Sequence, residues 1–371
     1  MNEHVVWEQR WHPLREEWVL YTSHRGGRPW LGETKSTETE TIPAYDPDCA
    51  LCPGNARLNG QNPRYTGTYW FTNDLPCFGP PGEVPEIKPD AGLLYRRRAA
   101  LGTAEVVCYH PDHSRTFADL SPAEAVEVVQ LWGERYKELG SRPEVNHVLI
   151  FENKGTLVGT SNPHPHCQIY ASSMLYGITE REVVSSSNYF RKTGQLLGQA
   201  IWQREAESSR VISQNRHFLA CVPWFARYAY EVYILPKQPT ASLSDLDAER
   251  RRSLAEQMIE VAIRYDNLWQ MPMPYVMAIH QAPTDGRDYI FYPFHLEYHP
   301  PLRKPDTMKY LAGPEIGGGS MTNESDPDAK AAELKAVSKI LYRATNRRTL
   351  TSGDAVGRLG QAPQGPGCPG G

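Results

Sequence analysis

Two histidines placed two positions apart form the part of this chain that is best suited to chemistry. His164 and His166 belong to a run that reads Ser-Asn-Pro-His-Pro-His-Cys-Gln over residues 161–168. In an extended strand alternate side chains share a face, so His164, His166 and Gln168 would form a row. The two prolines fix their own φ angles and stiffen the backbone under the row. The row predicts a catalytic surface, and a pair of surface histidines in a proline-rich turn is the plain alternative.

A free imidazole can attack a phosphoryl group when an acceptor such as a backbone carbonyl holds its other ring nitrogen. We assign the role of nucleophile to His166. The charge on the phosphate must be met by donors, and those available are Gln168, Ser161, Asn153, Arg25 and Arg28. Gln168 has no acidic proton, so the leaving group must depart unaided, as a sugar phosphate can. The same lack disfavours the activation of water. The residues therefore favour a ping-pong transferase over a hydrolase.

Two further groups of residues have the composition of metal sites. The first could form a closed, structural zinc site, and it consists of Cys49, Cys52, His113 and His164. Such a site would hold the first residue of the row and leave His166 free of metal; a His113 that touches no metal is the alternative. The second group suits zinc or iron, and it consists of Glu182, His280, His295 and Glu297. A hydrogen-bonded polar cluster without metal is the alternative there.

The composition is that of an ordinary globular protein. The chain has 371 residues, of which 40% are hydrophobic and 22% charged, and its net charge is −4. A slightly acidic balance argues against a nucleic-acid partner. No apolar run of about 18 residues and no basic-then-apolar leader occur, which argues against a membrane protein. The seven cysteines then indicate reduced thiols, and we expect a cytoplasmic protein.

An internal repeat predicts the elements that hold these residues. In the first half, a strand over 104–109 leads to an amphipathic helix over 121–139 and a strand over 145–151. In the second half, a helix over 247–268 and a strand over 275–279 follow in the same order. Each half then reaches a strand that contains histidine. A duplicated α+β unit explains this order.

Residue types suggest how the two copies align at the histidine strand. His295 follows His164 by 131 residues, and at this offset Glu297 stands where the first half has His166. One half is therefore expected to keep the nucleophile, whereas the other half has lost it.

Several segments together resemble the galactose-1-phosphate uridylyltransferase family of the histidine-triad superfamily, over about residues 5–320. The Ser-Asn-Pro-His-Pro-His-x-Gln run of residues 161–168 is the most specific of them. The other segments are His24-Arg25 with Arg28-Pro29-Trp30, Phe71-Thr72-Asn73-Asp74, Asp112-His113-Ser114, Phe151-Glu152-Asn153-Lys154-Gly155, and His299-Pro300-Pro301-Leu302.

The resemblance implies an α+β fold of two tandem histidine-triad-like halves, which share a large, mostly antiparallel half-barrel sheet with flanking helices. The halves would be residues 1–195, with the nucleophile and the Cys/His zinc site, and residues 196–346. Residues 347–371 are rich in Gly and Pro and are expected to be a disordered tail. The family also implies a homodimer that acts on UDP-glucose and galactose 1-phosphate in the Leloir pathway of galactose metabolism.

The resemblance also implies roles for single residues. His166 would be the uridylylated nucleophile, and Gln168 would stabilise the intermediate. The Cys/His group falls at the family's zinc positions. The second group falls at its second metal site, where a His in some members is Glu here, and would hold iron or a second zinc. The substrate-binding positions would be Arg25, Arg28, Asn73, Asp74, Asn153, Gly159, Ser161, Lys309 and Glu315.

The chain departs from the family pattern in the segment expected to contact the sugar, and two alternatives to a uridylyltransferase are weighed beside it. Pro314 stands where an aromatic residue is expected, and an expected glutamine is absent from residues 317–323. One alternative is a nucleotidyl phosphorylase that acts on an ADP-sugar and inorganic phosphate. The other is a zinc-stabilised nucleotide-binding protein without turnover.

Overall fold

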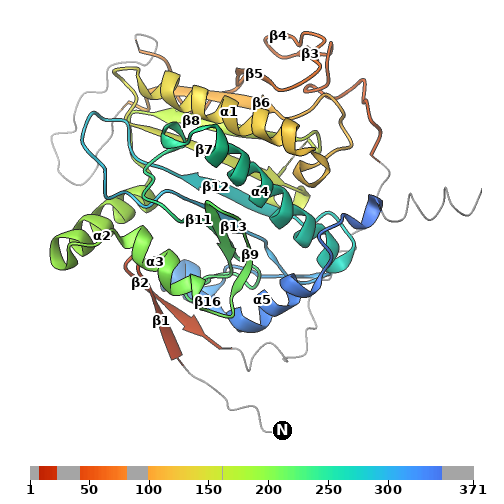
Figure 1. Cartoon of the computed structure of the whole chain (residues 1–371). Coiled ribbons are helices and arrows are strands. Elements are labelled where there is room, and N and C mark those ends of the chain that lie inside the picture. The colour runs from red at the N-terminus through yellow and green to blue at the C-terminus, as the bar shows by residue number, and fades with distance from the viewer. Residues whose placement is uncertain (1–7, 23–41, 82–98, 161, 345–371) are drawn as a thin grey trace, which may run out of the picture.

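A nine-stranded sheet forms the centre of the protein (Figure 1). The structure, a computed structural model, describes residues 8–22, 42–81, 99–160 and 162–344. All neighbouring strands of this sheet are antiparallel. In sheet order they are β5 (Tyr69–Thr72), β6 (Gly102–Cys108), β8 (His166–Ser172), β7 (His147–Lys154), β12 (Tyr275–His280), β13 (His295–His299), β11 (Val232–Pro236), β10 (Phe218–Cys221) and β9 (Val211–Gln214). The predicted α+β class with a large antiparallel sheet is confirmed.

Two long helices, α1 (Pro122–Gly140) and α4 (Ala248–Trp269), pack together across one face of the sheet (Figure 1). Ser121 caps α1 as predicted: its side chain accepts a hydrogen bond from the Glu124 N–H, and the Glu124 carboxylate accepts one from the Ser121 N–H. Apolar side chains of both helices and of alternate strand residues form one continuous core. This core is the framework that fixes the direction of every strand residue on the opposite face.

Smaller elements surround this framework, and α2 and α3 lie at one end of the molecule beside the β1–β2 hairpin (Figure 1). β16 pairs with β2 in parallel and so ties a late segment to an early one. Within the part of the chain described here, no helix is long and apolar enough to cross a bilayer. The remaining bounds are α2 (Gly177–Thr193), α3 (Leu197–Ala206), α5 (Pro327–Ala336), β1 (Glu8–His12), β2 (Glu17–Tyr21), β3 (Ala56–Arg57), β4 (Gly60–Gln61), β14 (Leu302–Lys304), β15 (Thr307–Met308) and β16 (Thr322–Asn323).

The sheet has an internal two-fold pattern about the junction of β7 and β12. On one side the order is β7, β8, β6, β5, and on the other it is β12, β13, β11, β10. In sequence, α1 lies between β6 and β7 of one copy, and α4 lies between β11 and β12 of the other. The predicted duplication is therefore present in the fold, with both copies joined in one sheet.

The start of the histidine strand sets the correspondence between the copies. β8 begins at His166, and β13 begins at His295. In each, the ring Nδ1 bonds the carbonyl oxygen two residues earlier: His166 bonds His164 O at 2.7 Å, and His295 bonds Pro293 O at 2.6 Å. His295, and not Glu297, therefore corresponds to His166, and the predicted alignment is corrected by two residues.

The pairing registers agree with this correspondence. Phe151 of β7 pairs with Gln168 and with Ala278 of β12. Ala278 in turn pairs with Glu297, so Gln168 and Glu297 lie in one row across the sheet and correspond when the two-fold axis passes between Phe151 and Ala278. Alignment by residue type failed because a shift of two residues keeps every side chain on the same face of its strand. The alternation of polar residues is then the same in both alignments.

Glu152 of β7 is a carboxyl group in the core beneath the helices, with only 5% of its surface exposed. Its Oε2 accepts hydrogen bonds from the hydroxyls of Tyr109 at 3.3 Å and Tyr275 at 3.4 Å. Burial raises the pKa of Glu152 from 4.5 to about 7. The folded protein therefore binds this proton more tightly than the unfolded chain does.

We expect Glu152→Gln to change how stability depends on pH. Since the carboxyl pKa is higher in the folded state, the free energy of unfolding of the parent falls as the pH rises from 4.5 through 7. The loss is about 3 kcal/mol, and Gln, which does not ionise, removes it. Urea unfolding at pH 5 and pH 8 measures the free energy of unfolding of both proteins. The difference, variant minus parent, should be more positive at pH 8 than at pH 5. Glu138→Gln, at a carboxylate 57% exposed, is the control, and an equal difference at both pH values would refute the assignment.

Candidate active site

His166 stands at the start of a strand in the interior of the sheet, between β6 and β7. Alternate residues of β8 divide between the two faces: Cys167, Ile169 and Ala171 are buried in the core, while His166 and Gln168 point to the other face and are partly exposed. His164 precedes the strand and is buried. The predicted row of three is therefore a row of two, preceded by a buried histidine.

One nitrogen of the His166 ring is anchored, and the other is free to react. Nδ1–H donates to His164 O at 2.7 Å, which leaves the lone pair on Nε2. Burial lowers the pKa of His166, and the bond to the His164 carbonyl raises it in part. The ring is therefore neutral at pH 7, the form that a nucleophile requires.

Contacts place two of the predicted substrate-binding residues beside β8, and a third has an unusual backbone angle. The Asn73 amide donates to Gln168 Oε1 at 3.4 Å, and no hydrogen bond among the described residues engages the Gln168 NH₂ group. Asn153 lies on β7 two residues beyond the Phe151–Gln168 pair, at the level of His166. Gly159 has a left-handed φ of 85°, a conformation that favours glycine.

The other predicted contacts are placed less directly. Asp74 accepts a hydrogen bond from Arg57 at 2.8 Å, so this carboxylate is already paired. Lys309 and Glu315 lie together, with 3.2 Å between Nζ and Oε1. Among the described residues, no hydrogen bond or ion pair joins that pair to the nucleophile's strand. The remaining predicted positions lie outside the described residues: Arg25, Arg28 and Ser161.

The predicted zinc ligands come together in one buried group, with ligand atoms within 4.8 Å of one another: Cys49, Cys52, His113 and His164. Cys52 Sγ lies 3.5 Å from His113 Nδ1 and 3.6 Å from His164 Nδ1. A thiolate and an imidazole bound to one tetrahedral zinc ion, at about 2.3 and 2.05 Å, lie about 3.6 Å apart. The spacing therefore fits a closed metal site of the predicted kind.

Two residues that support this group were missed by sequence reasoning. The Tyr65 hydroxyl lies 2.9 Å from His164 Nε2 and donates to Leu51 O at 2.6 Å. Nε2–H of His164 therefore donates to Tyr65, which leaves Nδ1 facing the thiolates. Asn162 Nδ2 donates to Cys49 Sγ at 3.2 Å. No sequence signal marks either residue, because both lie in irregular segments.

The second predicted group also comes together, at the position that corresponds to the nucleophile's site in the other copy. Its ligand atoms lie within 4.8 Å of one another, and its residues are buried: Glu182, His280, His295 and Glu297. Two imidazoles and two carboxylates are a donor set for zinc or iron. His280 Nδ1 lies 2.9 Å from Glu182 Oε1, and His295 Nε2 lies 3.1 Å from Glu297 Oε1. These are hydrogen-bond distances.

A buried arginine that the sequence did not single out joins this second group. Arg15 NH2 lies 2.5 Å from Glu297 Oε2, and both side chains are almost fully buried. Burial alone would lower the pKa of Arg15, but Glu297 more than offsets that effect, and the pKa is raised. The guanidinium therefore keeps its charge inside the protein.

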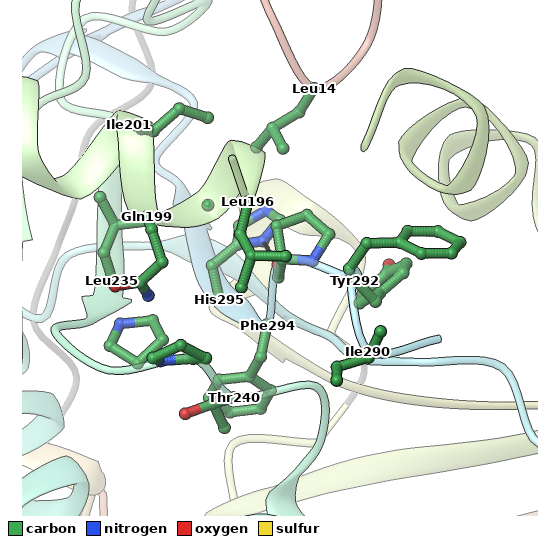
Figure 2. A pocket seen from close by; sticks show the side chains of 15 residues that line it. Leu14, Leu196, Gln199, Ile201, Leu235, Thr240, Ile290, Tyr292, Phe294 and His295 are labelled. Carbon is green, nitrogen blue, oxygen red and sulfur yellow. Dashed lines mark hydrogen bonds between the residues drawn. The ribbon is translucent and has the colours of Figure 1, made fainter. Parts of the chain in front are cut away.

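A mainly apolar pocket lies beside the second group (Figure 2). Side chains from α3, from the segment after β11 and from residues 290–294 form its walls, and His295 is the member of the group that lines it. Its lining includes no Lys or Arg, so it offers a phosphate no fixed cation. This pocket is therefore poorly suited to hold a phosphate group.

Comparison with known proteins places this geometry in a family. Residues 1–175 match the family model "Galactose-1-phosphate uridyl transferase, N-terminal domain", and residues 182–346 match "Galactose-1-phosphate uridyl transferase, C-terminal domain". Galactose-1-phosphate uridylyltransferase of Haemophilus influenzae is 36% identical, over 90% of this chain and 95% of that protein. The enzyme of that name from Rattus norvegicus is 34% identical, over 93% of this chain and 92% of that protein.

Solved structures agree with the assignment. A uridylyltransferase structure superimposes with a TM-score of 0.71 at 28% identity, over 89% of this chain and 97% of that one. An Arabidopsis thaliana ADP-glucose phosphorylase with bound ADP-glucose shares the fold, with a TM-score of 0.72 at 22% identity over 89% of this chain and 99% of that one. From the sequence matches, which span nearly the whole chain, the protein belongs to the galactose-1-phosphate uridylyltransferase family.

Proposed function

We propose that this protein transfers UMP from UDP-glucose to galactose 1-phosphate, by a ping-pong mechanism through a uridylyl group on His166. The observation that carries the proposal is the state of that ring: its Nδ1 is anchored on His164 O, its Nε2 is free, and its neighbour on the face is an amide. The uridylyltransferase relatives, at up to 36% identity over 90% of the chain, support the choice of substrates.

In the first step, His166 Nε2 attacks the α-phosphorus of UDP-glucose. A P–N bond forms, and the P–O bond to glucose 1-phosphate breaks, with the electron pair leaving on the sugar phosphate. A phosphate leaving group needs no proton, which matches the absence of an acid at Gln168. We assign to the NH₂ group of Gln168 the hydrogen bond to the uridylyl phosphate, and the contact of its carbonyl oxygen with Asn73 supports this role.

In the second step, a phosphate oxygen of galactose 1-phosphate attacks the same phosphorus. The new P–O bond forms UDP-galactose, and the P–N bond breaks and returns the electron pair to Nε2. Water is a poor substitute because the amide of Gln168, the neighbour of His166 on this face, cannot act as a base. The residues that we propose for substrate binding are Arg25, Arg28, Asn73, Asp74, Asn153, Gly159, Ser161, Lys309 and Glu315.

We also propose that zinc occupies the site formed by Cys49, Cys52, His113 and His164. Its role would be structural: it would hold the His164 side chain, and with it the backbone carbonyl that anchors His166. Zinc in this site takes no part in bond making. Supporting observations are the match of the sulfur–nitrogen distances to a tetrahedral ion and the free, buried thiols of Cys49 and Cys52.

The wider organisation is part of the same proposal. We infer a cytoplasmic homodimer, with halves that divide between residues 195 and 196 and a tail over 347–371. The buried free thiols are consistent with a reducing compartment. The tail lies outside the described residues.

His166→Ala should abolish the covalent intermediate. After incubation with UDP-glucose, intact-protein mass spectrometry of the parent should show a UMP adduct that galactose 1-phosphate removes, and the variant should show none. His217→Ala, which removes an imidazole 3.2 Å from Glu249, is the control and should label normally. Labelling that survives in His166→Ala would refute the mechanism.

The same assay separates the alternative functions. An AMP adduct from ADP-glucose, released by inorganic phosphate, would identify a nucleotidyl phosphorylase. A parent protein that forms no adduct with either nucleotide sugar would be a binding protein. Only a UMP adduct discharged by galactose 1-phosphate agrees with the proposal.

Tyr65→Phe should weaken zinc retention. The change removes the acceptor that orients His164 Nε2–H, and loss of such a partner lowers metal affinity by about 10- to 100-fold. Competition with a chromogenic chelator measures the affinity. Tyr69→Phe is the matched control, because the Tyr69 ring stacks on Tyr65 at 4.9 Å and no described hydrogen bond joins its hydroxyl to the site. Equal zinc affinities of parent and Tyr65→Phe would contradict the proposed orientation.

A further inference from the structure

The two metal-like groups of this protein differ in their internal spacing. In the Cys/His group, the sulfur–nitrogen distances of 3.5 and 3.6 Å leave room for an ion between the ligands. In the second group, nitrogen and oxygen approach to 2.9 Å and 3.1 Å. Nitrogen and oxygen on one tetrahedral zinc ion, each about 2.05 Å from it, would lie about 3.3 Å apart. Two contacts of the second group are therefore shorter than a tetrahedral ion would set, whereas His295 Nε2 and Glu182 Oε1 lie 3.8 Å apart.

The hydrogen bonds of the second group account for both oxygens of Glu297. Oε1 faces His295 Nε2 at 3.1 Å. Oε2 accepts from Arg15 at 2.5 Å and faces His299 Nε2 at 2.8 Å. His280 lies between the two carboxylates, with Nδ1 2.9 Å from Glu182 and Nε2 3.4 Å from Glu297. Glu297 is thus met on both oxygens by groups of the chain itself. Glu182 Oε2 accepts hydrogen bonds from His280 Nδ1 and the Tyr292 hydroxyl, and Glu182 Oε1 has no hydrogen-bond partner among the described residues.

The position of Arg15 is fixed by its segment. It lies in the turn between β1 and β2, where the next residue, Glu16, has a left-handed φ of 49°, which is uncommon for a residue other than glycine. On the other side, Leu14 is buried against apolar residues that include Leu197 and Tyr233. Ser185 Oγ of α2 donates to Leu14 O at 2.9 Å. The turn is therefore inserted between α2, α3 and the sheet, and it carries the guanidinium with it.

We propose that Arg15 is the resident cation of this second centre and that it keeps divalent metal ions out. Its charge neutralises Glu297 in a place with almost no access to water. A metal ion bound to Glu182 and Glu297 would face this fixed positive charge at close range, where repulsion is weakly screened. In this chain a protein cation therefore supplies the positive charge that a metal would bring to Glu297, and it joins the β1–β2 turn to β13.

The test is the number of metal ions per chain. The parent should hold at most one tightly bound ion, in the Cys/His site. Arg15→Met should gain about one more ion, with an affinity for zinc at least about tenfold above that of the parent's second centre. Plasma mass spectrometry counts the ions after exposure to zinc and gel filtration. After refilling with cobalt(II), a thiolate-to-cobalt charge-transfer band identifies the ion at the cysteines, and an ion at the second centre lacks it.

A second variant covers a failure of Arg15→Met to fold, since that change leaves a buried carboxylate without its partner. Arg15→Met with Glu297→His removes the unpaired charge and should also gain one ion. Arg135→Met is the matched control: Arg135 is a buried arginine paired with Glu105 at 2.6 Å, and its loss should leave the ion count unchanged.

Two results would overturn the proposal. One is a parent protein with a chelator-resistant ion that has no thiolate ligand. The other is an ion count in both Arg15 variants equal to that of the parent. Neither result depends on transferase activity, so the ion count and the UMP adduct test separate claims.

Discussion

The hydrogen bond from the His166 ring to the carbonyl oxygen of His164 is the contact on which the reactive site depends. It fixes which nitrogen of His166 carries the proton, and therefore which nitrogen can attack. That carbonyl belongs to the residue whose side chain enters the Cys/His group, with Nδ1 3.6 Å from Cys52 Sγ. A group of residues that does no chemistry thus sets the position of the acceptor that the nucleophile needs. Tyr65 extends the same chain of contacts by one step.

The duplicated sheet uses corresponding places in opposite ways. In the first copy, the face that carries His166 and Gln168 is partly open. In the second copy, the corresponding His295 and Glu297 are fully buried, because the β1–β2 turn, α2 and α3 cover that face. The same backbone arrangement therefore supplies a reactive surface in one half and a buried cluster of charged side chains in the other. A substrate cannot reach a covered face, so a nucleophile would have no role there.

Much of this arrangement could be predicted from the sequence, because strong local patterns specify it. The capped start of α1, the strand–helix–strand order of each copy and the grouping of the Cys and His ligands all follow from residue types and spacing. The register between the copies could not be predicted, since a shift of two residues leaves the alternation unchanged. Arg15 and Tyr65 were missed for a different reason. Their importance comes from contacts with residues 282 and 99 positions away in the chain, and no local pattern records such contacts.

The pairing of β7 with β12 has a consequence for what happens when the two halves are separated. Five residue pairs join these strands across the centre of the sheet, from Tyr275–Lys154 to Ile279–Ile150. If the polypeptide were cut between its halves, each fragment would expose an edge strand whose backbone amide and carbonyl groups have no partners. Exposed edge strands form backbone hydrogen bonds with each other and with strands of unrelated chains. Neither fragment would fold stably on its own. Two co-expressed fragments would have to associate before they aggregate.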